Sequence, residues 1–186
     1  MTQQDHSKAH RRAARLADIT KLLVFFEGGG GCYSYSTCAP GSTWFDPVVD
    51  SSDSPGRMRG IFDLADQRNP FRDWSAVVIP SCTGDVFIGS TDHTYRQGRR
   101  RILIRHRGWY NGEAALHWAF AHVRSPKRVL VAGSSAGSVG SAFHAPEVPS
   151  NGRRATHGRS SVMASASSQR IRSSVTSRTN VAQALA

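Results

Sequence analysis

A serine between two glycines is the strongest chemical signal in this sequence. Gly133, Ser135 and Gly137 have the G-x-S-x-G spacing, in which the serine lies on a tight turn between a strand and a helix and its hydroxyl points outward. A serine presented in this way can attack a carbonyl carbon and form an acyl-enzyme. An ordinary Gly/Ser turn is the competing interpretation, because a chain with 17 glycines can contain the bare pattern by chance.

A run of four glycines, Gly28 to Gly31, follows Glu27 and the apolar run LLVFF. Glycines at the end of a strand can direct backbone N–H groups into a site, where they stabilise an oxyanion. A phosphate cradle is the alternative, but neither glycine-rich phosphate motif fits this run or residues 133–140. Together with the serine turn, the run favours a site for acyl transfer.

Three short apolar runs predict the strands that must position these loops: residues 22–26, 76–80 and 128–132. A helix is predicted between the second and third runs, with Asn111 as its N-cap, Glu113 in its first turn and Ser125-Pro126 after its end. Its apolar face consists of Ala115, Leu116, Ala119, Phe120 and Val123. Strand, crossover helix and strand form a parallel βαβ unit, so we expect an α/β fold with a three-stranded parallel sheet and flanking helices. The segment 33–73 predicts long loops with one short helix around residues 61–65.

Length and composition set the limits of the domain. The chain has 186 residues, a formal net charge of +11 and 39% hydrophobic residues, which suits one modest domain. Residues 1–20 are predicted as a flexible basic extension, and 147–186, rich in Ser and Arg, as a disordered tail. No run approaches the ~20 apolar residues of a membrane span, and we expect neither an export signal nor a zinc site, because the three cysteines lack ligand spacing.

Four segments in the same order resemble the pectin acetylesterase family, which also includes the Notum-type carboxylesterases: residues 22–38, 60–90, 106–112 and 129–146. The resemblance covers about residues 21–146. It implies a partial α/β-hydrolase-like domain, truncated relative to the family, that removes acetyl or other acyl groups from a polysaccharide or a similar ester. It also implies a Ser, Asp and His triad with no metal or cofactor, and it suggests secretion, although we expect no signal peptide in this sequence.

The resemblance also implies residue roles. It makes Ser135 the nucleophile. It implies three backbone N–H donors for the oxyanion: Gly29, Gly30 and Ala136. It matches Cys32 and Cys82 to positions that bring two loops together as a disulfide, which would leave Cys38 without a partner.

The partners of Ser135 are missing from their expected place. In this fold the acid and then the histidine follow the serine, yet no Asp follows Ser135 and the only later carboxylate is Glu147. His144 lies nine residues on, a rise of about 13 Å along a helix, so we expect it to be structural. His157 lies among arginines with no acid to orient it. Four upstream groups follow strands, and the resemblance assigns their segments to site walls and packing: Asp85, Asp92, His93 and His106.

We therefore expect impaired catalysis, with an inactive family remnant as the alternative; the abrupt change after Pro146 also suggests that the tail is read out of frame. The basic cluster at 97–108 raises a second alternative, a nucleic-acid-binding protein. No recognition motif accompanies it, so the cluster is interpreted as a solvated face, with neither nucleic acid nor membrane expected as a partner. The sequence leaves open the ester, the compartment and the oligomeric state.

Overall fold

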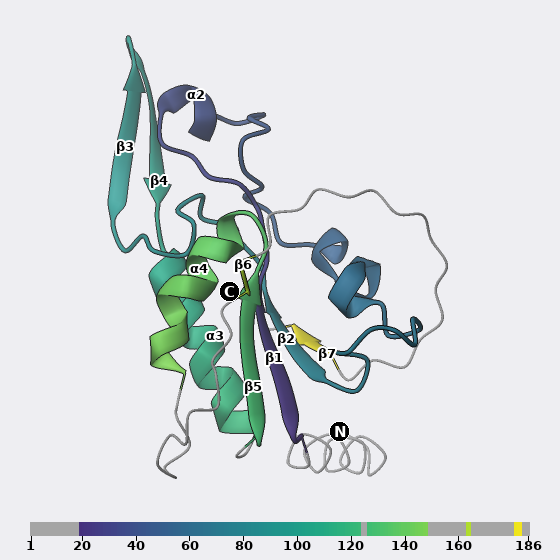
Figure 1. Cartoon of the computed structure of the whole chain (residues 1–186). Coiled ribbons are helices and arrows are strands. Elements are labelled where there is room, and N and C mark those ends of the chain that lie inside the picture. The colour runs from purple at the N-terminus through teal and green to yellow at the C-terminus, as the bar shows by residue number, and fades with distance from the viewer. Residues whose placement is uncertain (1–18, 124–125, 149–162, 165–180, 184–186) are drawn as a thin grey trace, which may run out of the picture.

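A parallel β-sheet forms the centre of the molecule (Figure 1). The computed structural model describes residues 19–123 and 126–148, together with the backbone of two short strands at 163–164 and 181–183. The sheet contains the three predicted strands: β1 (Lys21–Phe26), β2 (Ser75–Ile79) and β5 (Arg128–Gly133). Strand β1 lies between the other two and pairs in parallel with both. The α/β class with a parallel sheet is thus confirmed. The two candidate loops follow β1 and β5, which are neighbours, so both loops lie at the carboxyl ends of the strands.

Two short strands that the sequence analysis does not predict widen this sheet. Strand β6 (Met163–Ala164) pairs with β5, and β7 (Val181–Gln183) pairs with β2, both in parallel. The order is β6-β5-β1-β2-β7. The sheet therefore has five strands instead of the three expected, and both additional strands lie within the segment predicted as a disordered tail. The predicted flexible extension, except for its last two residues, and the remainder of the predicted tail after Val148 lie outside the described residues.

Helices cover one face of the sheet and a long loop region covers the other (Figure 1). Helices α3 (Gly108–His122) and α4 (Ala136–His144) pack on the face that carries Leu22, Val24 and Phe26. Three 3₁₀ helices lie on the opposite side: η1 (Ser51–Asp53), η2 (Pro55–Arg57) and η3 (Gly60–Phe62). Ile61 and Phe62 pack there against Leu23, so the short helix predicted at 61–65 exists as η3 and is one turn long.

Helix α3 begins four residues earlier than the sequence predicts, because its N-cap is Arg107 instead of Asn111. Its first residue is Gly108, and Asn111 is not its N-cap. The Gly108 N–H donates to the Asp85 carboxylate at 2.7 Å, so a side chain from the loop after β2 satisfies the helix start and complements its dipole. Glu113 accordingly lies beyond the first turn. The predicted apolar face is confirmed, since four of its members are buried and Phe120 is half-buried: Ala115, Leu116, Ala119 and Val123.

A β-hairpin projects beyond the edge of the sheet at which the parallel strands end (Figure 1). Strands β3 (Asp92–Gln97) and β4 (Arg100–Arg105) pair antiparallel around a two-residue turn in which Gly98 has φ 60°. The short helix α2 (Tyr35–Cys38) packs against both strands. The sequence analysis interpreted residues 97–108 as a solvated basic run and did not predict that they form part of a hairpin.

No described helix combines the length and apolar character of a membrane span. No described group of three or more His, Cys, Asp or Glu side chains is arranged to hold a metal ion.

Candidate active site

Ser135 lies on a strained turn between β5 and α4. Its backbone has φ 50° and ψ −120°, outside the regions that non-glycine residues normally occupy. Holding such a residue costs about 1–3 kcal/mol and is common at functional sites. A Cβ on Gly137 would overlap the Phe26 carbonyl, so the close approach of α4 to β1 requires glycine there. The exposed Ser135 has the geometry of a nucleophile elbow.

The glycine run after β1 lies directly beside this turn. The Gly28 N–H donates to Ser134 Oγ at 3.2 Å. A Cβ on Gly28 would lie 2.9 Å from both the Ser134 carbonyl oxygen and Ser135 Cβ, which is closer than real contacts of this kind. Only glycine therefore allows the two loops to touch. Parallel pairing of β1 with β5 brings them together, as the sequence analysis requires of an acyl-transfer site.

Three backbone N–H groups at this junction have no hydrogen-bond partner among the described residues: those of Gly29, Gly30 and Ala136. The first two are fixed in place because the Gly29 carbonyl accepts from Asp46 N–H at 3.1 Å and the Gly31 N–H donates to the Trp44 carbonyl at 3.0 Å. The third opens helix α4, whose dipole favours negative charge at that end. These are the groups predicted as oxyanion donors, and their availability is compatible with that role.

His144 is a structural residue, as the sequence analysis expects. The ring is completely buried, with Nδ1 3.1 Å from Glu113 Oε1 and Nε2 2.9 Å from the Phe87 carbonyl oxygen. It stacks between Phe26 and Trp109, with ring centroids 5.2 and 4.9 Å away. Both ring nitrogens are thus occupied by acceptors inside the core, and the ring is not free to take a proton from Ser135.

The upstream candidates are also engaged in contacts that hold loops together. His106 is buried, with Nδ1 2.8 Å from the Thr83 carbonyl oxygen and Nε2 3.0 Å from the Tyr95 hydroxyl. Besides capping α3, Asp85 accepts hydrogen bonds from the Thr83 hydroxyl and from a backbone N–H. Asp92 forms ion pairs with two arginines of the hairpin region, and the exposed His93 ring lies against Tyr95. His157 lies outside the described residues.

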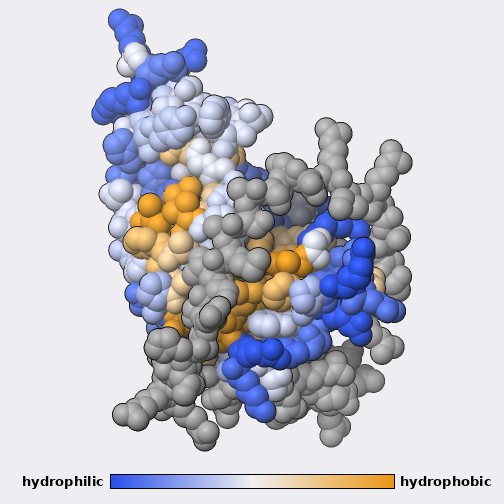
Figure 2. Space-filling view, in the orientation of Figure 1, coloured by the Kyte–Doolittle hydropathy of each residue, from blue (hydrophilic) through white to orange (hydrophobic). Residues whose placement is uncertain are grey.

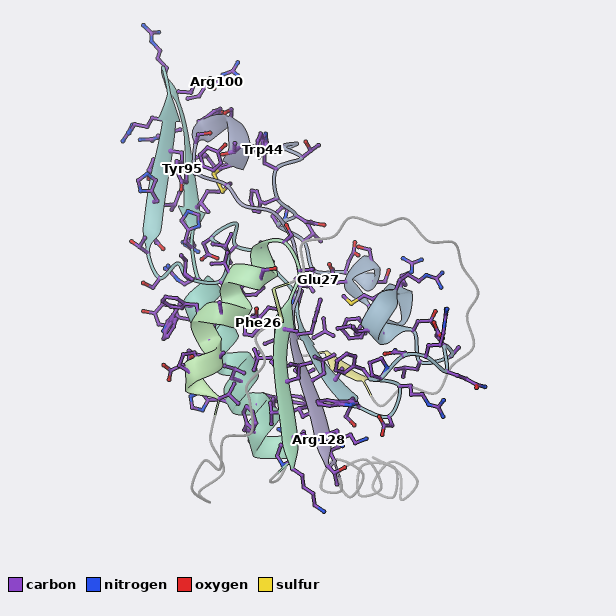
Figure 3. The ribbon with its side chains drawn as sticks, viewed as in Figure 1. Phe26, Glu27, Trp44, Tyr95, Arg100 and Arg128 are labelled. Atoms are coloured by element: carbon purple, nitrogen blue, oxygen red, sulfur yellow. A yellow bond between two sulfur atoms is a disulfide. The ribbon has the colours of Figure 1, made fainter. Side chains whose placement is uncertain are left out.

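Glu27 is a titratable group at the site to which the sequence analysis assigned no role. Glu27 follows the last residue of β1 and is half-buried (labelled in Figure 3). Its Oε2 atom is buried and has no hydrogen-bond partner in the described part of the chain. Burial, and then the nearby charges of Asp53 and Asp46, raise its pKa from 4.5 to about 7. If the alternation of β1 continues to this residue, Glu27 lies on the face of Leu23, the face that η1 with Asp53 covers. The sequence signal that could have identified Glu27 is a carboxylate placed directly after a buried strand.

The predicted pairing of Cys32 with Cys82 is wrong. Cys32 forms a disulfide with Cys38, because the single turn of α2 brings their Cα atoms to 5.0 Å. The two loops that the resemblance joined are adjacent, but backbone contacts connect them: Cys32 N–H donates to the Gly84 carbonyl at 2.8 Å. Cys82 is a free, half-buried thiol whose pKa is raised mainly by burial.

Comparison with known proteins relates the chain to esterases. It matches the sequence profile of the family described as Pectinacetylesterase over residues 10–157. It is 33% identical over 86 residues to a Danio rerio protein named inactive palmitoleoyl-protein carboxylesterase notum1b, covering 45% of this chain and 62% of that protein. It is 28% identical over 126 residues to Xenopus laevis palmitoleoyl-protein carboxylesterase notum2, covering 64% of this chain and 24% of that protein.

A plant protein is also among the relatives. The chain is 27% identical over 131 residues to Arabidopsis thaliana pectin acetylesterase 4, covering 66% of this chain and 30% of that protein. The chain thus spans less than two thirds of the length of each of these relatives. No solved structure matches it.

Proposed function

Because this chain belongs to the pectinacetylesterase family, we propose that it is a serine carboxylester hydrolase that removes acetyl or other acyl groups from a polysaccharide or a similar ester. Ser135 is the nucleophile in this proposal. The observation that carries it is the exposed Ser135, held at φ 50° within contact distance of the glycine run. No other exposed serine in the described ranges has a positive φ.

The proposed reaction follows from this geometry. Ser135 Oγ attacks the ester carbonyl carbon while its proton passes to water, and the carbonyl oxygen becomes an oxyanion. The N–H groups of Gly29, Gly30 and Ala136 stabilise that charge. The carbon–oxygen bond to the alcohol then breaks, the alcohol takes up a proton, and water hydrolyses the acyl-enzyme to release the acid and restore the Ser135 hydroxyl.

We expect slow turnover, because the buried histidines in the described part of the chain form other hydrogen bonds and do not serve as the base for Ser135. His144 and His106 each have both ring nitrogens occupied. When triad members are missing, oxyanion donors and binding alone leave about 10³- to 10⁴-fold acceleration over water. That residual rate is the expected level of activity.

Hydrolysis of a chromogenic acetate ester tests the proposal. The expected result is weak turnover that disappears in Ser135→Ala and is unchanged in Ser90→Ala, a control at an exposed serine with no side-chain hydrogen bond among the described residues. Intact mass should show one acetyl group on the protein before steady state and none on Ser135→Ala. Equal hydrolysis by the parent chain and by Ser135→Ala would overturn the assignment.

A second candidate is a family member that binds esters without turning them over. His144, His106 and Asp85 already have other hydrogen-bond partners, which favours this candidate. The Danio rerio relative is itself named inactive. The same assay separates the two. Acetylation of Ser135 that releases one equivalent of alcohol and is not followed by release of acetate, or no reaction at all, would favour the inactive protein.

A further inference from the structure

An apolar surface on the outer side of helices α3 and α4 takes no part in the proposed reaction. Four large apolar residues form it, each between 43% and 55% exposed: Ile88, Tyr110, Val139 and Phe143. Figure 2 shows orange to pale surface over this region, in contrast to the blue hairpin above it. We call these four residues the helix patch.

Contacts around Trp109 join the helix patch into one continuous surface. The Phe143 ring packs edge-to-face against the Trp109 ring, with centroids 5.4 Å apart. The carbonyl of Gly89, the residue after Ile88, accepts from Trp109 N–H at 3.0 Å. Val139 lies one turn before Phe143, so both side chains point to the same side of α4. The tyrosine of the patch is the residue of α3 that follows Trp109.

The two helices that carry the patch are almost free of charge. Glu113 is the only Asp, Glu, Lys or Arg within residues 108–122 and 136–144, and its Oε1 lies 3.1 Å from Nδ1 of the buried His144 ring. The whole chain, in contrast, has a formal net charge of +11. Two copies therefore repel each other, and the repulsion is weakest where uncharged faces meet and keep the charges apart. Few charges and several aromatic rings are also typical of the core of a protein interface.

The area of the helix patch is close to what a dimer needs. A fully buried aromatic side chain removes about 150–250 Å² from water, so the two half-exposed aromatic residues of the patch offer about 100 Å² each. The two aliphatic residues add about 50 Å² each. A patch of about 300 Å² is in the range of the largest apolar patches on soluble monomers, which are often functional. Because apolar atoms make up about 60% of an interface, two such patches imply a total buried area of about 1,000 Å², the lower limit for a specific interface.

We propose that the helix patch is the interface of a symmetric homodimer, in which the patch of one copy packs against the same patch of a second copy. A two-fold axis brings identical surfaces together, and an uncharged apolar surface is complementary to itself. Ser135 lies one turn before Val139 on α4, so the second copy borders the candidate active site. The small area predicts a weak dimer. The dimer does not depend on the proposed function.

Sedimentation velocity of the full chain tests the dimer directly. The expected result is a mass that rises from 20.2 kDa to a plateau at twice that value as the protein concentration increases from about 1 μM to about 200 μM. Added NaCl should leave the dimer unchanged or strengthen it, because the interface is apolar and salt screens the net positive charge. Three results would overturn the proposal: a mass of 20.2 kDa at every concentration, dissociation by salt, or growth beyond two copies without a plateau.

Two double variants separate the helix patch from apolar surface in general. Val139→Ser/Phe143→Ser should weaken dimerisation at least about tenfold, because central aromatic residues contribute most to the affinity of an interface. Val48→Ser/Leu103→Ser removes two exposed apolar side chains elsewhere and should change dimerisation less than about twofold. Equal loss in the two double variants would contradict the assignment of the interface to this face.

Loss of folding is controlled separately, because Phe143 also contacts Trp109. The unfolding midpoint in denaturant is measured for each variant at about 1 μM, where a weak dimer has dissociated and no longer adds to stability. Tyr110→Ser, at a ring that is 55% exposed, should weaken the dimer about threefold or more with an unchanged midpoint. Parent-like dimerisation of Tyr110→Ser and of the patch double variant would overturn the proposal. No ester enters these measurements, so their failure leaves the esterase proposal standing.

Discussion

Replacing Glu27 by glutamine should remove a pH-dependent weakness beside the active-site loop. In the folded chain burial and two nearby carboxylates raise the pKa of Glu27 from 4.5 to about 7. The folded state therefore keeps a proton that the unfolded chain loses above pH 4.5. Stability falls as pH rises through the window from 4.5 to 7 and then levels off. Glutamine resembles the protonated form and carries no charge at any of these pH values.

The size of the effect follows from the pKa. A rise from 4.5 to about 7 corresponds to at most about 3 kcal/mol. Water reaches part of this half-buried side chain and screens its charge, so we expect about 1–2 kcal/mol. Glu27→Gln should thus match the parent chain near pH 4.5 and exceed its unfolding free energy by that amount at pH 8.

Denaturant unfolding followed by tryptophan fluorescence measures this difference across the pH range, since the chain has four tryptophans. Glu147→Gln is the matched control, because it makes the same chemical change at an exposed glutamate. The Asp46 N–H, which donates to Gly29 beside Glu27, should also exchange faster at pH 8 in the parent chain than in Glu27→Gln. Parallel stability curves for the parent and Glu27→Gln from pH 4.5 to 8 would refute the reasoning.

Two further predictions concern the same loops. Gly28→Ala should lower the unfolding free energy by about 1–3 kcal/mol, because its Cβ meets two atoms at 2.9 Å, whereas Gly56→Ala, whose nearest neighbour is 3.8 Å away, should stay within about 0.5 kcal/mol in the same denaturant titration. Alkylation of the unreduced, unfolded chain followed by peptide mass analysis should label Cys82 alone; label on Cys38 would restore the pairing of Cys32 with Cys82.

Local sequence was sufficient for the three central strands of the sheet and for the turn at Ser135. The apolar runs at 22–26, 76–80 and 128–132 each become a buried parallel strand, because continuous apolar character is what a strand covered on both faces needs. The spacing of Gly133, Ser135 and Gly137 likewise predicted a tight turn, since only small residues fit between β1 and α4.

Contacts between distant segments were beyond such reasoning. The start of α3 is set by Asp85, 23 residues before it, and no helix signal near Asn111 could indicate that. The Cys32 pairing depends on a one-turn helix inside a loop that has no apolar period. The hairpin, by contrast, carried a signal that was passed over: Gly98 between two alternating segments is typical of a two-residue turn.

Covalent labelling of Ser135 is the most direct measurement of the central claim. A serine-reactive fluorophosphonate should form an adduct with the folded chain, mapped by peptide mass analysis to Ser135 and absent from the neighbouring Ser134. The reaction should be faster than in the denaturant-unfolded chain, because only the folded chain presents the oxyanion donors. Equal labelling of folded and unfolded protein, or an adduct on another serine that persists in Ser135→Ala, would contradict the account.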